Sequence, residues 1–214
     1  MSRARTFGLA ACALAIYGCS GGLFQSHEVA PNVYQLRAPA VAAAPARVAA
    51  TLVVARPRAR PGLESDRIVV TLADRRIDVY AGSRWSAPLP DLVESLLLDG
   101  LRSSGGWEAV VSERSEFPGR YLLQTEIREF AADYATGRGP PTVRVTLHGE
   151  FGSRAGQRFG AIVEGHAEVA AGADRQREVV AAFEAAYGQA AALLIAAVHA
   201  AALEAVPAPR ASAP

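Results

Sequence analysis

The sequence predicts an α+β fold, a single domain in which a mixed, largely antiparallel sheet is covered by two helices. Three observations lead to this prediction. The 214 residues, half of them hydrophobic, have room for one globular domain with a sizeable core. In the second half of the chain, apolar and polar residues alternate as they do in half-buried strands. Two further segments, 89–103 and 174–205, have the apolar spacing of three and four that is typical of helices.

The first part of the domain has the composition of short strands. The expected strands are 33–36, 48–55, 67–72 and 76–80. Their β-branched residues favour strand over helix, and a short turn at 73–75 joins the last two. Between the first two strands, residues 38–45 are rich in Ala and Pro, so we expect a linker that only packing can order.

The segment 89–103 is expected to be a helix with one apolar face, which needs a sheet to cover it. That face comprises Leu89, Leu92, Val93, Leu96, Leu97 and Leu101. Gly105 and Gly106 end the helix, and a strand is expected at 107–112.

Three alternating segments then predict an antiparallel meander. They are 121–130, 143–148 and 159–169. The helix at 174–205 follows, and its longest apolar run, 190–203, is too short to span a bilayer. Residues 207–214 are expected to be a disordered tail.

The N-terminus resembles a bacterial export signal. Arg3 and Arg5 precede an apolar run at 7–16, and the run ends in Ile16-Tyr17-Gly18-Cys19, which resembles a lipobox. This resemblance implies removal of residues 1–18 and acylation of Cys19. The alternative is an ordinary secretory signal that contains a cysteine by chance.

Acylation of Cys19 would leave the processed chain without a free thiol, because Cys12 lies in the removed peptide. We therefore expect no disulfide and no cysteine-based site. Residues 19–32 are expected to be a lipidated tether and 33–206 the folded domain. Ser20 is compatible with sorting to the outer membrane, since an Asp at that position favours retention in the inner membrane in sorted lipoproteins.

Charge and motifs exclude several function classes. The 22 basic residues, all Arg, balance 21 acidic ones, which is too even for an electrostatic grip on nucleic acid. A chain without Lys has no phosphate-binding Gly-Lys-Ser/Thr loop, and it has no Gly-x-Ser-x-Gly elbow. We expect no cofactor.

One group of residues has metal-ligand or acid–base chemistry. It consists of His148-x-Glu150 and Glu164-x-His166-x-Glu168, each set on one face of its own strand. A solvated sheet face is the favoured interpretation, because no helical His pair supports a zinc site. The alternative is a periplasmic hydrolase or metal-dependent enzyme that uses His148, His166 and nearby carboxylates.

The segment Arg84-Trp85-Ser86-Ala87-Pro88-Leu89 can act as a staple that fixes the angle between a strand and the helix that follows. It comes after the lipobox, the strand Val33-Tyr34-Gln35-Leu36, the strand Arg67-Ile68-Val69-Val70 and Tyr80, and before the Leu-rich and Ala-rich helices. In this order the segments resemble the ABC-type transport auxiliary lipoproteins, the PqiC-like family that accompanies transporters containing MCE-domain proteins.

This resemblance implies a non-enzymatic, lipid-anchored periplasmic component that helps to move phospholipid or other hydrophobic cargo between the inner and outer membranes. Its expected partners are an MCE-domain protein and an ABC-type permease and ATPase, and its expected location is the periplasmic face of the outer membrane. Tyr80 and Trp85 are candidate contacts with a partner protein. The alternative for Trp85 is a structural place in the hydrophobic core. One alternative function remains open, that of an outer-membrane assembly lipoprotein of similar fold. Assembly into a homo-oligomer is also left open.

Overall fold

The computed structural model describes residues 30–134, 137, 139–154 and 158–205. Its elements are β1 (Asn32–Tyr34), β2 (Val48–Val54), β3 (Arg58–Ala59), β4 (Arg67–Leu72), β5 (Ile77–Trp85), α1 (Leu89–Ser103), β6 (Trp107–Ser112), β7 (Tyr121–Tyr134), β8 (Thr142–Ser153), β9 (Arg158–Ala170) and α2 (Gln176–Ala205). The expected signal peptide, Cys19, most of the expected tether and the expected tail lie outside the described residues.

The sheet is organised around β7, the longest strand, which pairs along both edges. One edge pairs antiparallel with β8, and β8 pairs antiparallel with β9. The other edge pairs in parallel with three short strands in succession, β2, β3 and β4. The sheet continues beyond them through β6 next to β2 and through β5 and β1 next to β4. The long pairings are therefore antiparallel and the short ones mostly parallel.

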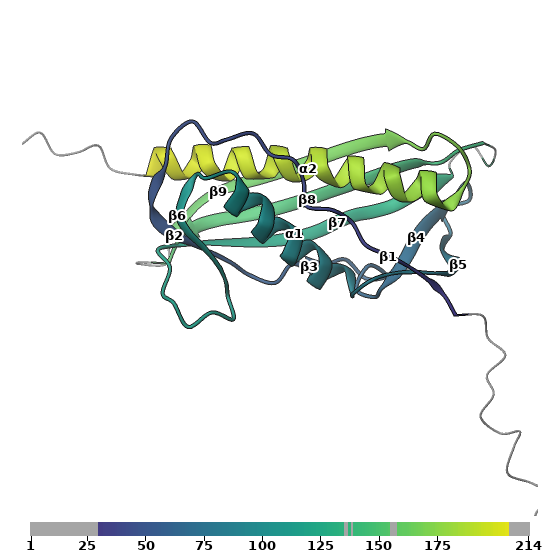
Figure 1. Cartoon of the computed structure of the whole chain (residues 1–214), viewed down its shortest axis with the longest axis horizontal. Coiled ribbons are helices and arrows are strands. Elements are labelled where there is room, and N and C mark those ends of the chain that lie inside the picture. Colours follow the sequence, from purple (N-terminus) through teal and green to yellow (C-terminus); the bar gives the residue numbers. More distant parts are fainter. Residues whose placement is uncertain (1–29, 135–136, 138, 155–157, 206–214) are drawn as a thin grey trace, which may run out of the picture. The chain divides into compact units, whose positions relative to one another are not determined.

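Both helices lie on the same face of this sheet (Figure 1). Helix α2 runs along the meander of β7, β8 and β9, and α1 lies beside it near β6 and β3. The inward side chains of the strands and the apolar faces of the two helices form one core. The opposite face of the meander carries the polar half of the alternating residues, as the period-two pattern predicts.

The predicted fold class is confirmed, and α1 has the predicted bounds. One expectation about a strand was wrong, and one strand was not predicted. The strand expected to end at Tyr80 continues to Trp85, because it pairs with both β4 and β1. The two-residue strand β3 was not predicted, since it exists only through its pairing with β7.

The apolar run 190–203 is shorter than a bilayer, but helix α2 as a whole, with 30 residues, is long and apolar enough to cross a membrane by length and composition alone. It packs against the sheet instead, and Phe183, Tyr187, Leu194 and Val198 are fully buried along its length. Its apolar composition therefore serves the core of the domain, as is common for a buried helix.

Candidate functional site

Tyr80, a predicted contact residue, lies on β5 and is half-buried in a chain of hydrogen bonds. Its phenol donates to the phenol of Tyr134 on β7, which in turn donates to a carboxylate oxygen of Asp174, 2.6 Å away, just before α2. Partial burial raises the pKa of Tyr80 and that of Tyr134 above their ordinary values, so both phenols stay protonated at neutral pH. The chain ties the start of α2 to the sheet and borders an open hollow of about 620 Å³.

Trp85, the second predicted contact, lies in the core with 1% of its surface exposed. Its ring meets Phe130 and Phe183 at steep angles, with centroids 6.0 and 5.2 Å away. A side chain placed this way cannot contact a partner protein without leaving the core. The staple interpretation accounts for its position, because Ser86 N–H donates to the carbonyl of Tyr34 while Leu89 N–H donates to that of Ser65 at the start of α1.

The sheet register brings the two His/Glu sets together on the outward face. His148 lies opposite Glu164, and Thr146 lies opposite His166. His148 Nδ1 is 3.8 Å from a Glu164 oxygen, and His166 Nδ1 is 2.9 Å from the Thr146 hydroxyl. Glu150 lies opposite Ile162 and stays apart from this group.

Arginines pair with the carboxylates of this face. Arg128 lies 2.9 Å from Glu126 and 3.7 Å from Glu164, and Arg144 lies 3.2 Å from Glu168. The hydrogen bond from Arg128 lowers the pKa of Glu126 below its ordinary value. Within the described ranges, no group of three or more His, Cys, Asp or Glu is placed to hold a metal ion. The arrangement is a surface ladder of ion pairs.

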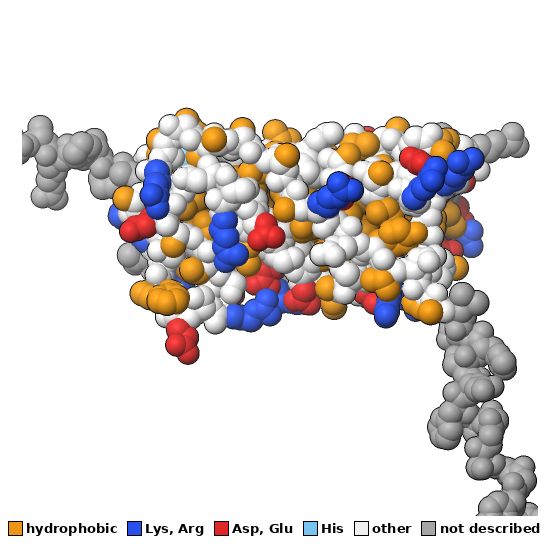
Figure 2. All heavy atoms as spheres, in the orientation of Figure 1, with side chains coloured by type: hydrophobic (Ala, Val, Ile, Leu, Met, Phe, Trp, Pro, Cys, Tyr) orange, Lys and Arg blue, Asp and Glu red, His pale blue; other side chains and the backbone are white. Residues whose placement is uncertain are grey.

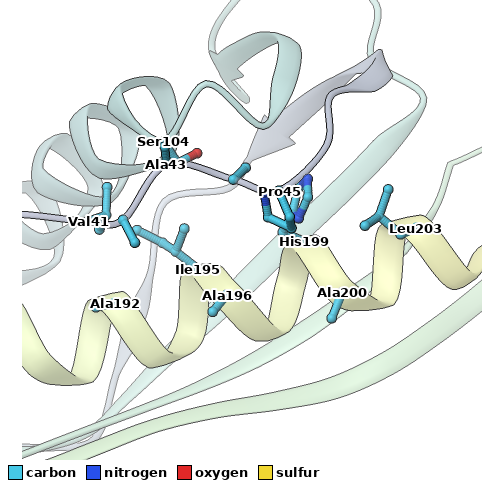
Figure 3. Close-up of a pocket in the computed structure, with 12 residues that line it drawn as sticks. Val41, Ala43, Pro45, Ser104, Ala192, Ile195, Ala196, His199, Ala200 and Leu203 are labelled. Atoms are coloured by element: carbon cyan, nitrogen blue, oxygen red, sulfur yellow. The ribbon is translucent and has the colours of Figure 1, made fainter.

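An apolar pocket of about 340 Å³ lies between residues 41–45 and the second half of α2 (Figure 3). Sequence reasoning missed it. Its lining includes Val41, Ala43, Ile195, Ala196, His199 and Leu203. The signal that was available is composition: the Ala/Pro-rich segment and the Ala-rich end of α2 both offer small side chains, which leave space where two surfaces meet.

Hydrogen bonds hold the 41–46 segment over α2. His199 Nε2 donates to the carbonyl oxygen of Ala46 at 2.7 Å, and Ala44 N–H donates to the carbonyl oxygen of Ser104 at 2.8 Å. His199 is 5% exposed, and its ring lies nearly perpendicular to that of Trp107 with centroids 6.3 Å apart. The segment predicted to be ordered only by packing is therefore ordered by packing and by these bonds.

Charge is evenly mixed on the helix-bearing face of the molecule. Figure 2 shows basic and acidic side chains interspersed there, with hydrophobic side chains between them. Such a face has no extended field of one sign to attract a polyanion.

The comparisons with known proteins agree with this geometry. The model of a family described as ABC-type transport auxiliary lipoprotein component matches residues 34–196. A protein of Xanthomonas campestris with a known crystal structure is 26% identical in sequence to this chain. The two structures match with a TM-score of 0.74 over 81% of this chain and 97% of that one.

Two further solved structures share the fold at lower identity. An uncharacterised protein is 18% identical with a TM-score of 0.60, over 77% of this chain and 95% of that one. A hypothetical protein of Chlamydia trachomatis is 9% identical with a TM-score of 0.51, over 73% of this chain and 99% of that one. No curated protein matches this chain.

Proposed function

We propose, from the premise that this chain belongs to the family of ABC-type transport auxiliary lipoprotein components, that it is a non-catalytic, lipid-anchored periplasmic part of a transporter for hydrophobic cargo. The observation that carries this proposal is the family match over residues 34–196, which runs from β1 into the last third of α2. The cargo would be phospholipid or another hydrophobic molecule that moves between the inner and outer membranes. The working partners would be an MCE-domain protein and an ABC-type permease and ATPase.

The anchor in this proposal is acylated Cys19, in the sequence Ile16-Tyr17-Gly18-Cys19. Each buried methylene group contributes roughly 0.8 kcal/mol to membrane binding, so several acyl chains on one residue hold a protein that one chain would hold only weakly. Ser20 supports a place on the periplasmic face of the outer membrane. A chain with 22 basic and 21 acidic residues gains little from attraction to anionic lipid.

A role through contact rather than catalysis agrees with the ion-pair ladder. Arginines pair with the carboxylates near His148 and His166, and His166 contacts the Thr146 hydroxyl on the neighbouring strand. Such contacts are the environment of a stable, solvated sheet face. Tyr80 is the better of the two predicted partner contacts, because it borders an open hollow whereas Trp85 is buried. The hydrolase or metal-dependent enzyme is the competing function, and elemental analysis separates it from this one.

Cysteine substitutions in the native host test the anchor. Cys19→Ala protein is expected in the soluble periplasmic fraction and still folded, whereas Cys12→Ala, a matched change inside the signal, is expected to stay with the outer membrane. Membranes are separated by density and the protein is followed by immunoblot. Membrane-bound Cys19→Ala protein, or wild type in the inner-membrane fraction, would contradict the proposed anchoring or location.

The partners are tested by purification of the wild-type protein from crosslinked cells. The proposal expects an MCE-domain protein, a permease and an ATPase among the specifically captured proteins. Capture of an outer-membrane assembly complex in their place would instead support the assembly-lipoprotein alternative.

A further inference from the structure

The pocket beside α2 has the dimensions of a single hydrocarbon chain. Its lining on α2 extends from Ala192 to Leu203, which corresponds to about 16 Å along a helix axis. Division of its 340 Å³ by this length gives a cross-section of about 20 Å². A single hydrocarbon chain whose carbon atoms lie about 4 Å from the wall atoms fills a channel of about this width. A helix, at about 10–12 Å across, does not fit.

The lining also favours a hydrocarbon over an extended peptide. The side chains are almost all Ala, Val, Ile, Leu and Pro, and the polar ones are Ser104 and His199. Both already make hydrogen bonds, Ser104 Oγ to the carbonyl of Leu101 and His199 to that of Ala46. A peptide would leave its backbone N–H and C=O groups without partners there, which costs free energy that an acyl chain does not lose.

The two ends of the pocket differ in their surroundings. Near the Val41 end, Ile195 packs closely against α1, since a Cβ on Gly100 would lie 2.8 Å from its Cδ1 and 3.1 Å from Pro39 Cγ. Near the Leu203 end, Leu203 is 37% exposed and His199 hydrogen-bonds to Ala46, which Arg47 follows in the chain.

Arg47 is a cation without an acidic partner. Its guanidinium donates to the carbonyl oxygens of Trp107 and Glu108, at 3.2 and 3.3 Å, and it forms no ion pair among the described residues. These carbonyls hold the group in place and leave its charge uncompensated. An anionic headgroup at this end would complement it, with the hydrocarbon extending toward Ile195.

We infer that this pocket binds one acyl chain of a phospholipid, with about a dozen carbon atoms between residues 41–45 and α2 and the phosphate near Arg47. The carbon count follows from the volume, since an apolar cavity of about 150 Å³ holds one benzene molecule. The inference rests on the proposed function and names the part of the cargo that this chain would hold. It commits to a separate lipid rather than to an acyl chain on Cys19, because the anchor needs its own chains in the bilayer.

The pocket is tested by equilibrium binding to purified Cys19→Ala protein. The ligands are lysophosphatidylglycerols with acyl chains of 8 to 16 carbons, each used below its critical micelle concentration. Affinity is expected to rise about fourfold per methylene group and to level off near 12 carbons, where the pocket is full. Ala196→Phe fills the pocket from an exposed position and is expected to weaken binding at least tenfold. Ala185→Phe, at another exposed position of α2 that lies outside the pocket, is the matched control.

The headgroup is tested with Arg47→Gln. This variant is expected to bind 12-carbon lysophosphatidylglycerol about threefold more weakly, as for an exposed ion pair, and to bind the uncharged monolauroyl glycerol as the parent does. Circular dichroism and thermal unfolding verify that each variant is folded. Absence of saturable binding, or equal affinities for Ala196→Phe and Ala185→Phe, would overturn the inference.

The source of the chain is tested on the acylated protein in phospholipid nanodiscs that contain a photoactivatable diacyl phospholipid. Crosslinks are expected on the α2 peptide around Ala196 in wild type and Ala185→Phe, and not in Ala196→Phe. Crosslinking of Cys19→Ala protein but not of acylated protein would show that the protein's own acyl chain fills the pocket, which contradicts a separate lipid. Neither result affects fractionation or partner capture, so failure of this inference is distinguishable from failure of the proposed function.

Discussion

The indole of Trp85 meets the phenyl ring of Phe183 edge-on, with centroids 5.2 Å and planes 83° apart. Trp85 ends β5 and Phe183 lies on α2, so this contact joins the strand that leads into α1 to the other helix of the layer. Phe130 of β7 stacks on Phe183 with centroids 5.2 Å apart, which completes an aromatic cluster over the central strand. Such pairs contribute beyond the area that they bury.

Replacement of Trp85 by Ala is therefore expected to destabilise the domain by about 3–5 kcal/mol, through the lost aromatic contacts and the cavity that remains. Urea unfolding of Cys19→Ala protein, followed by circular dichroism, measures this change. Phe159→Ala, at a side chain that is 64% exposed, is the control and is expected to shift stability by less than about 0.5 kcal/mol. A small effect for Trp85→Ala would restore its candidacy as a surface contact.

The elements that could be predicted from the sequence are those with a local periodic pattern of apolar residues. The spacing of leucines predicts α1 with its observed bounds, and alternation predicts the meander and its polar outer face. Non-local packing decides the rest. The parallel pairing of β2, β3 and β4 along one edge of β7 leaves no local pattern, and β3 has only two residues. The pocket was equally out of reach, because it depends on how residues 41–45 approach a helix that lies some 150 positions later.

The ion pair between Arg56 and Asp91 predicts a pH-dependent contribution to stability. The guanidinium lies 2.6 Å from the carboxylate and lowers the pKa of Asp91 below 3.8. Because the folded state binds this proton less tightly than the unfolded state, the contribution is complete above about pH 5 and is lost as the pH falls through the folded pKa.

A double-mutant cycle with Arg56→Gln and Asp91→Asn is expected to give a coupling of about 0.5 kcal/mol at pH 7, since both side chains are partly exposed. The coupling should approach zero well below pH 3.8, where Asp91 is protonated in both states. Thermal unfolding at several pH values measures it. Coupling that is as large in strong acid as at pH 7 would rule out an ionic origin.

The phenol of Tyr134 is expected to stabilise the start of α2. Tyr134→Phe removes the donor to Asp174 and leaves the half-buried Tyr80 hydroxyl without its acceptor, so a loss of about 1–2 kcal/mol is expected. Tyr80→Phe removes only the outer bond and should cost less. Hydrogen exchange of the first turns of α2 reports the effect locally. Equal protection in wild type and Tyr134→Phe would show that the bond does not hold the helix.

The outward ladder is expected to bind no stoichiometric metal. Elemental analysis of purified Cys19→Ala protein, before and after dialysis with zinc, should give well under one equivalent, and His166→Ala should leave that value unchanged. The physical reason is that Glu164 and Glu168 already face Arg128 and Arg144. One tightly held equivalent that disappears in His166→Ala would favour the metal-dependent enzyme.

Gly165 on β9 is expected to tolerate no side chain, because the backbone of α2 lies very close to it. A Cβ at Gly165 would lie 1.9 Å from the backbone carbonyl oxygen of Ala190, so the helix itself would have to move. Gly165→Ala should therefore destabilise the domain by about 3 kcal/mol. Gly188→Ala on α2, where a Cβ meets nothing within 4 Å, should instead stabilise it by up to about 1 kcal/mol. Denaturant unfolding of the two variants measures both signs. Equal stabilities would mean that α2 does not approach β9 this closely.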